Sequence, residues 1–148
     1  MIHSFAQKSV VVIKPASVAT NATSTGNIDR LGYDYAAIDI VLDSQSSTTS
    51  KPAVLKLSES DDTVATNFAD ITAFTGGTST GNFTIPNASA AANIVRMNVD
   101  CRARKRYLKV SLTPGDAAQI ACVTANLSRG KDAPLTATEH GVSALVTG

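Results

Sequence analysis

An acidic turn offers the densest set of oxygen ligands in this chain. Glu59, Asp61 and Asp62 lie within four residues of one another, and carboxylate oxygens are ligands that calcium prefers. Their spacing lacks the every-second-residue pattern and the central glycine of a calcium-binding loop. We therefore interpret this acidic turn, residues 59–62, as solvated, and we expect no metal site.

A group of basic residues follows later in the chain, in a segment that we call the basic elbow: Arg102, Arg104, Lys105 and Arg106. Such side chains could contact phosphates, which supply much of the affinity in nucleic-acid binding. Aromatic side chains that would stack on bases do not accompany them, apart from Tyr107. We expect no nucleic-acid partner and interpret the elbow as a contact for an acidic protein surface.

Catalytic chemistry has little support in the sequence. His3 and His140 lie at opposite ends of the chain, and neither is near a nucleophile motif. Asp34, Asp39 and Asp43 could be read as the carboxylates of a sugar hydrolase. Because Asp39 and Asp43 share one face of a predicted strand, a solvent-facing stripe or a subunit contact is the preferred interpretation. We expect no enzyme and no cofactor.

These residues must be positioned by short strands. Hydrophobic residues make up 43% of the chain and aromatic residues 5%, with no tryptophan, so the core is expected to consist of Val, Ile, Leu and Ala. Runs of alternating apolar and polar residues predict eight strands, at about 9–13, 35–43, 53–60, 68–74, 82–86, 94–101, 107–113 and 117–125. Eight short strands without a long helix predict an all-β fold, an antiparallel sandwich or jelly roll, with a barrel as the second choice.

The stretch from Val95 to Val123 has the clearest alternation. Its three strands are separated by the basic elbow and by a turn at Thr113-Pro114-Gly115-Asp116. Connections this short predict hairpins and therefore a three-strand antiparallel meander. Cys101 and Cys122 are expected to face the core as buried thiols, with a disulfide between them as the alternative.

The length of 148 residues and the mass of 15.3 kDa fit one domain covering residues 1–148. Residues 1–8 are predicted to form an N-terminal arm, and residues 127–148 an extended C-terminal tail. Residues 16–27, which are rich in Ala, Ser, Thr and Asn, predict a loop. An Ala/Ser linker at 87–93 could hold a single helical turn. The first residues lack a basic start followed by a long apolar run, so we expect synthesis in a cytoplasm.

The charges are unevenly distributed, although the net charge is only +1. Eight acidic residues against three basic ones give residues 29–70 a net charge of about −5. Residues 96–109 carry six basic residues and one acidic residue, a net of about +5. The small total argues against a general nucleic-acid or membrane-surface binder. The two opposite blocks could pair within the fold or between subunits.

Four segments resemble a known group of proteins: 30–36 (RLGYDYA), 55–62 (LKLSESDD), 83–86 (FTIP) and 104–109 (RKRYLK). Together they are similar to small structural proteins of tailed bacteriophages, among them capsid decoration or cement proteins. The similarity covers roughly residues 30–140. It implies a β-sandwich subunit, a homotrimer, that binds the outside of the major capsid protein shell and stabilises it in the virion.

Other functions fit the same residues. A head-completion, neck or tail component would share these features, and a carbohydrate- or receptor-binding module of a fibre or spike is a further alternative, supported by Tyr33 and Tyr35. Under the resemblance, the expected partners are the major capsid protein and further copies of the chain, without nucleic acid or membrane. We expect the basic elbow, the acidic turn and the two terminal arms to make the contacts, and their role to be adhesion.

Overall fold

Strands dominate the computed structural model, which describes residues 6–43, 52–77, 82–86, 93–131 and 136–145. Within these residues nine strands and two short 3₁₀ helices follow one another: β1 (Lys8–Val18), β2 (Ser24–Asp29), β3 (Tyr33–Leu42), β4 (Pro52–Ser60), η2 (Ala65–Asn67), β5 (Ala69–Gly77), β6 (Phe83–Thr84), β7 (Asn93–Asp100), η3 (Cys101–Ala103), β8 (Tyr107–Pro114) and β9 (Gln119–Gly130). The all-β sandwich expected from the sequence is confirmed.

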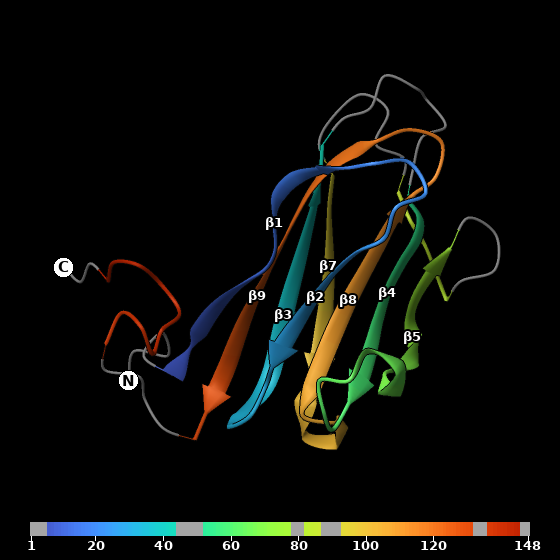
Figure 1. Cartoon of the computed structure of the whole chain (residues 1–148). Coiled ribbons are helices and arrows are strands. Elements are labelled where there is room, and N and C mark those ends of the chain that lie inside the picture. Colours follow the sequence, from blue (N-terminus) through green and yellow to red (C-terminus); the bar gives the residue numbers. More distant parts are fainter. Residues whose placement is uncertain (1–5, 44–51, 78–81, 87–92, 132–135, 146–148) are drawn as a thin grey trace.

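The strands form two sheets that pack face to face and overlap in the view of Figure 1. Sheet A has the order β1-β9-β3-β7, and sheet B has the order β2-β8-β4-β5-β6. The antiparallel pairs are nested: β4 pairs with β5, β3 with β7, β2 with β8 and β1 with β9. Nested pairs of this kind arise when one long antiparallel hairpin folds over into two sheets, which is the topology of a jelly roll.

The core lies between the sheets and follows the period-two pattern of the sequence. Leu108, Val110 and Leu112 of β8 are fully buried, as are Leu55 and Leu57 of β4. Their polar neighbours along each strand point to the outer face of sheet B. Alternating apolar residues therefore determine which face of each strand packs inward.

The predicted three-strand meander over 95–123 is wrong. β7 and β9 belong to sheet A, whereas β8 between them belongs to sheet B. The segments 101–106 and 115–118 are arches that cross from one sheet to the other. Packed sheets lie about 10 Å apart, so three or four extended residues suffice to cross, and a short connection does not by itself imply a hairpin.

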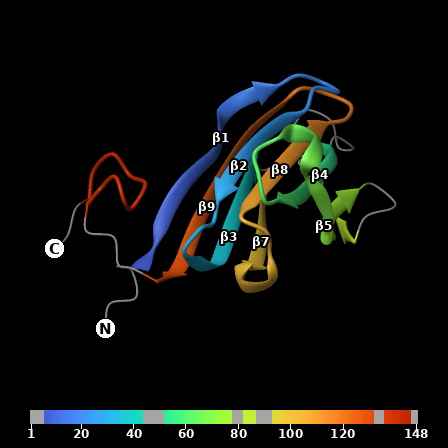
Figure 2. The ribbon, with the colours of Figure 1, turned by 60° about the horizontal axis from the view of Figure 1, so that its bottom comes forward.

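The predicted loop at 16–27 is wrong in part, because it contains the end of β1 and the first four of the six residues of β2. β2 has few β-forming residues but pairs with β8 along its whole length, with Gly26 opposite Val110. A Cβ placed on Gly26 would lie 2.0 Å from the carbonyl oxygen of Val12 in β1. Glycine therefore permits β1 and β2 to approach closely where one sheet meets the other. Figures 1 and 2 both show β1 and β2 on the same side of the sandwich.

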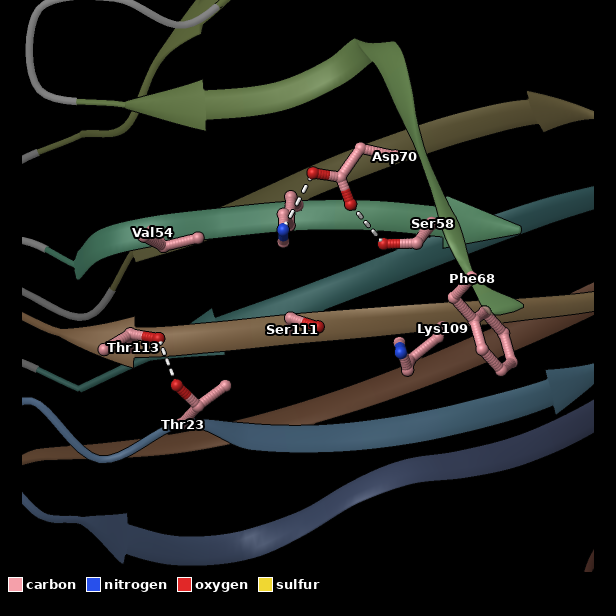
Figure 3. Close-up of a pocket in the computed structure, with 9 residues that line it drawn as sticks. Thr23, Val54, Ser58, Phe68, Asp70, Lys109, Ser111 and Thr113 are labelled. Carbon is pink, nitrogen blue, oxygen red and sulfur yellow. Dashed lines mark hydrogen bonds and ion pairs between the residues drawn. The ribbon is translucent and has the colours of Figure 1, made fainter. Parts of the chain in front are cut away.

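The start of β5 crosses the outer face of sheet B, where Figure 3 shows its side chains. β5 pairs with β4 at both ends, but its middle residues, 71–74, face only Leu57 of β4 and bulge away. Phe68, just before β5, lies over Lys109 of β8, and Asp70 hydrogen-bonds to Ser58 of β4. The crossing leaves a hollow on the surface of the sheet.

The prediction of an extended C-terminal tail, residues 127–148, is wrong in part over the described residues. β9 continues to Gly130, and residues 136–142 form a single helical turn. Thr136 and Glu139 cap its start reciprocally: the Thr136 N–H donates to Glu139 Oε2 (3.0 Å), and the Glu139 N–H donates to Thr136 Oγ1 (3.3 Å). Gly141, with φ +72°, ends it in a Schellman motif. The sequence Thr-x-x-Glu could have predicted this turn.

The C-terminal turn packs on the start of β1. The Ser9 N–H donates to the His140 carbonyl oxygen at 2.7 Å, and His140 Nδ1 donates to the Gln7 carbonyl oxygen at 2.9 Å. His140 is 8% exposed. The predicted N-terminal arm is thus held by the C-terminal turn from Gln7 onward, whereas residues 1–5 of that arm and the linker at 87–92 lie outside the described residues.

The two cysteines are free, and only one of them faces the core. Cys101 is fully buried in η3, and burial raises the pKa of its thiol to about 11. Cys122 is half-buried on the outer face of sheet A, because its neighbours Ala121 and Val123 face the core. The expectation of two core-facing thiols was wrong for Cys122, since the alternation in β9 has the opposite phase.

Candidate functional site

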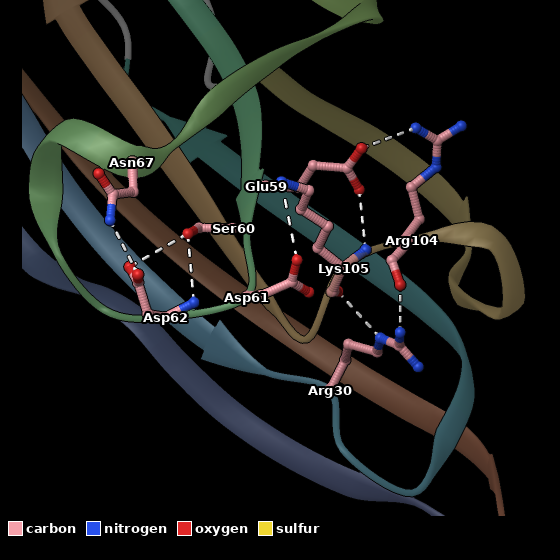
Figure 4. A network of polar contacts seen from close by, with 8 residues as sticks. All are labelled: Arg30, Glu59, Ser60, Asp61, Asp62, Asn67, Arg104 and Lys105. Carbon is pink, nitrogen blue, oxygen red and sulfur yellow. Dashed lines mark hydrogen bonds and ion pairs between the residues drawn. The ribbon is translucent and has the colours of Figure 1, made fainter.

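The basic elbow and the acidic turn, predicted as contact regions, lie together at one end of the sandwich (Figure 4). The acidic turn ends β4, and the elbow precedes β8, whose first residue Tyr107 is paired with Ser60. Antiparallel pairing of β4 and β8 therefore brings the two opposite charge blocks together. Of the two arrangements that the sequence left open, the structure shows pairing within the chain.

Glu59 is the acidic centre of this contact. Its Oε1 accepts from Arg104 Nη1 at 3.3 Å, and its Oε2 accepts from the backbone N–H of Lys105 at 3.0 Å. The Glu59 side chain is only 18% exposed. Lys105 Nζ lies 3.7 Å from Asp61 Oδ2 in a more exposed pair. The Glu59 carboxylate thus binds the elbow at two points, the side chain of Arg104 and the backbone N–H of Lys105.

Arg106 turns toward β2 instead. Its Nε and Nη2 donate to the two carboxylate oxygens of Asp29 at 3.1 and 2.7 Å, and its guanidinium lies 4.8 Å from the centre of the Tyr107 ring. The hydrogen bond from Arg106 is the main cause that lowers the pKa of Asp29. Asp29 was not among the residues predicted for the candidate site.

Arg102 does not join the acidic turn. It donates through Nε and Nη2 to Asp100 at 2.9 and 2.5 Å, and the Asp100 carboxylate also accepts the Arg102 backbone N–H. These bonds lower the pKa of Asp100 to about 2. The Arg102 side chain remains 66% exposed, so it is the most accessible charge of the elbow.

Arg30 is a second residue of this cluster, besides Asp29, that was not predicted from the sequence. Its Nε donates to the Lys105 carbonyl oxygen at 3.0 Å, and its Nη2 donates to the Arg104 carbonyl oxygen. Its backbone N–H also donates to the Arg106 carbonyl oxygen at 3.1 Å. Arg30 therefore supplies donors to the polar backbone of the elbow. The only signal in the sequence was its place before the Leu31-Gly32 turn.

Asp62 organises its own turn, as the solvated-turn interpretation requires. Its Oδ1 accepts from the Val64 N–H at 2.9 Å and from Ser60 Oγ at 3.3 Å, while its Oδ2 accepts from Asn67 Nδ2 at 2.8 Å. The Asn67 bond is the main cause that lowers the pKa of Asp62. Among the described residues, no three His, Cys, Asp or Glu side chains are arranged to hold a metal ion.

The residues weighed for catalysis are dispersed. Asp39 forms a bidentate pair with Arg96 across β3 and β7, at 2.6 and 2.8 Å. His140 lies in the C-terminal turn described above, and His3 lies outside the described residues. The arrangement around Asp39 is a cross-strand ion pair, which stabilises the sheet modestly.

A row of apolar side chains on the outer face of sheet A is a second surface that the sequence did not reveal. Val41 in β3 lies opposite Ile94 in β7 and opposite Cys122 in β9, and Ile120 follows on the same face of β9. Ile94 is 67% exposed and Ile120 is 51% exposed. We call these four residues the outer apolar row. They form an apolar row on three neighbouring paired strands, and two of its side chains are more than half exposed.

No family model matches the chain, and no curated protein matches it. The part of the chain that the structure describes contains no helix long and apolar enough to cross a membrane. The geometry of the fold and the resemblance of the four sequence segments are therefore the basis for a proposed function.

Proposed function

We propose that the protein is a structural component of a bacteriophage virion, a capsid decoration protein that binds the outside of the major capsid protein shell. As a symmetric oligomer, a homotrimer by the resemblance, it would reinforce that shell. The resemblance of the four segments supports this class of function. The jelly roll supports it too, because viral capsid proteins commonly use this fold, although a fold alone does not determine a function.

The observation that carries the proposal is the outer apolar row. Exposed apolar side chains that gather on a surface commonly mark a protein interaction site. The side chains of the outer apolar row belong to three neighbouring hydrogen-bonded strands, β9, β3 and β7. Because the backbone of these strands is already ordered, little conformational entropy is lost when a partner covers them. A rigid adhesive face suits a protein whose role is to cement other subunits.

The charge cluster has a supporting role in this proposal. Arg104, Lys105 and Arg106 each have an acidic partner within the chain, so an acidic partner from outside would have to compete with these groups. Their contact with another subunit stays a prediction. Intrachain pairing instead holds the end of the sandwich in one conformation, next to the exposed Arg102.

The experiment that tests the proposal compares shells assembled from the major capsid protein of the same phage genome with and without this protein. We expect shells that carry the protein to withstand heat at temperatures several degrees higher before they release their contents. Equal heat resistance, at protein concentrations that saturate the shell, would contradict the reinforcing role.

A further inference from the structure

A hollow on the outer face of sheet B has the features of a small binding site (Figure 3). The hollow has a volume of about 350 Å³. It lies between β4, β8 and the segment around Phe68 that crosses above them. This volume is within the usual range for ligand pockets. The hollow lies on the opposite sheet from the outer apolar row and is distinct from the charge cluster.

The lining is mostly polar and already organised. Asp70 accepts from Lys56 Nζ at 2.8 Å and from Ser58 Oγ at 2.7 Å. Ser58 is only 1% exposed although it is polar and belongs to the outer face. The hydrogen bond from Lys56 is the main cause that lowers the pKa of Asp70. The carboxylate therefore stays ionised and fixed at the wall of the hollow.

Lys109 is held beside it by two different contacts. Its Nζ lies 4.1 Å from the centre of the Phe68 ring and donates to the Ala65 carbonyl oxygen at 3.2 Å. A cation over an aromatic ring is stabilised in that position. The ammonium of Lys109 is thus positioned before any ligand arrives.

Hydrogen-bonding capacity remains for a ligand. An ammonium has three donors and a carboxylate about four acceptor sites, so Lys56, Lys109 and Asp70 each keep some of theirs. The register places Ser111 opposite Lys56, and Lys109 opposite Ser58. The two lysines are then diagonal neighbours, which on an antiparallel pair are about 7–8 Å apart at the backbone. Two ammonium groups and one carboxylate leave the hollow with a net positive charge.

We infer that this hollow binds a sugar residue that carries a carboxylate, such as a uronic acid. The ligand carboxylate would be held between Lys56 and Lys109 by charge-assisted hydrogen bonds. The ring hydroxyls would donate to the free acceptor sites of Asp70 and exchange hydrogen bonds with Ser111. An apolar ligand would leave the remaining hydrogen-bonding capacity of these groups unused, and a neutral sugar would leave the excess positive charge without a counter-charge.

The probes for the test are methyl β-D-glucuronoside, the neutral methyl β-D-glucoside, and acetate. Each is titrated into the full chain while the backbone amide signals are followed by NMR. We expect the glucuronoside to shift amides of β4, β8 and the start of β5, with an affinity at least tenfold higher than that of either the glucoside or acetate. No localised shift with glucuronoside at millimolar concentration would overturn the inference.

Two variants complete the test. Lys109→Met removes the ammonium but keeps an unbranched apolar side chain, and it should weaken glucuronoside binding at least tenfold. Lys14→Met removes the same charge from an exposed position in β1, and it should bind as the wild type does. Equal binding of the glucoside or of acetate, or unchanged binding by Lys109→Met, would contradict the inferred ligand.

Discussion

Gly26 in β2 faces the backbone of Val12 in β1 so closely that a Cβ at position 26 would lie 2.0 Å from the Val12 carbonyl oxygen. β1 belongs to sheet A and β2 to sheet B. This contact therefore closes the sandwich along one side, and neither backbone can move without disturbing the pairs β1–β9 and β2–β8. The position tolerates no side chain.

Gly26→Ala should destabilise the protein by about 3 kcal/mol, because backbone atoms and not a flexible side chain would have to move. Urea unfolding would measure the loss. The matched control is Gly32→Ala in the β2–β3 turn, where φ is +84° but no atom lies within 4 Å of the added methyl. It should cost about 1 kcal/mol through backbone strain alone. Equal losses in the two variants would contradict the close contact.

The pair between Glu59 and Arg104 should make a measurable contribution to stability. Both side chains are at least two-thirds covered, so we expect a coupling of about 0.5–1 kcal/mol, near the upper end for surface pairs. A double-mutant cycle with Glu59→Gln and Arg104→Met would measure it. A parallel cycle on Asp100 and Arg102, which are more than half exposed, should give a smaller coupling. The reverse order would show that the elbow is not anchored at Glu59.

Acid should destabilise the fold in a defined range of pH. Ion pairs and hydrogen bonds lower the pKa of Asp29, Asp39, Asp70 and Asp100 below the usual 3.8, that of Asp100 to about 2. Around and below pH 4 the unfolded chain then binds more protons than the folded one, so acidification favours unfolding. We expect the free energy of unfolding to be level above about pH 5 and to fall between about pH 4 and pH 2.

Urea unfolding at closely spaced pH values would show this decline. In Asp29→Asn the fall should be shallower, because one carboxylate with a lowered pKa is gone. A free energy of unfolding that stays constant down to pH 2, or one that rises, would contradict the ion pairs of the native state.

The two thiols should differ in reactivity. Cys101 is fully buried with its thiol pKa raised to about 11, whereas Cys122 lies half-exposed in the outer apolar row. A thiol reagent at pH 8 should therefore modify one cysteine per native chain, and the second only in denaturant. Cys122→Ser should abolish the native reaction. Two equally fast thiols in the native protein would be inconsistent with the burial of Cys101.

Sequence periodicity predicted the layers of this fold but not their connections. Leu108, Val110 and Leu112 alternate strictly, and their burial followed from that alone. β2 was missed because Gly26 and its neighbours are poor strand formers, and the strand exists through its pairing with β8. Hairpins and arches have similar lengths, so the meander could not be distinguished from a jelly roll by the length of 101–106.

The sequence predicted which charged residues belong to the candidate site, but it did not predict which of them pair with one another. The opposite charge blocks contain Glu59, Asp61, Arg104 and Lys105, which the structure brings together, but the sequence left open whether such blocks pair within the fold or between subunits. Asp29 and Arg30 were missed because their partners Arg106 and Lys105 lie 77 and 75 residues away in the sequence. Only the pairing of β2 with β8 brings these residues together. The outer apolar row was missed for a related reason. The sequence alone does not show whether Ile120 and Cys122, or their neighbours Ala121 and Val123, face the core.

Binding to the shell is the most direct test of the proposed function. Purified shells of the cognate capsid protein would be titrated with the wild-type protein and sedimented, and the bound copies counted per capsid subunit. We expect saturation at a fixed ratio set by the shell symmetry. Binding should be weaker for Ile94→Asp in the outer apolar row and unchanged for Leu31→Asp, at a similarly exposed apolar residue outside the row. The absence of saturable binding by the wild type would contradict the proposed function.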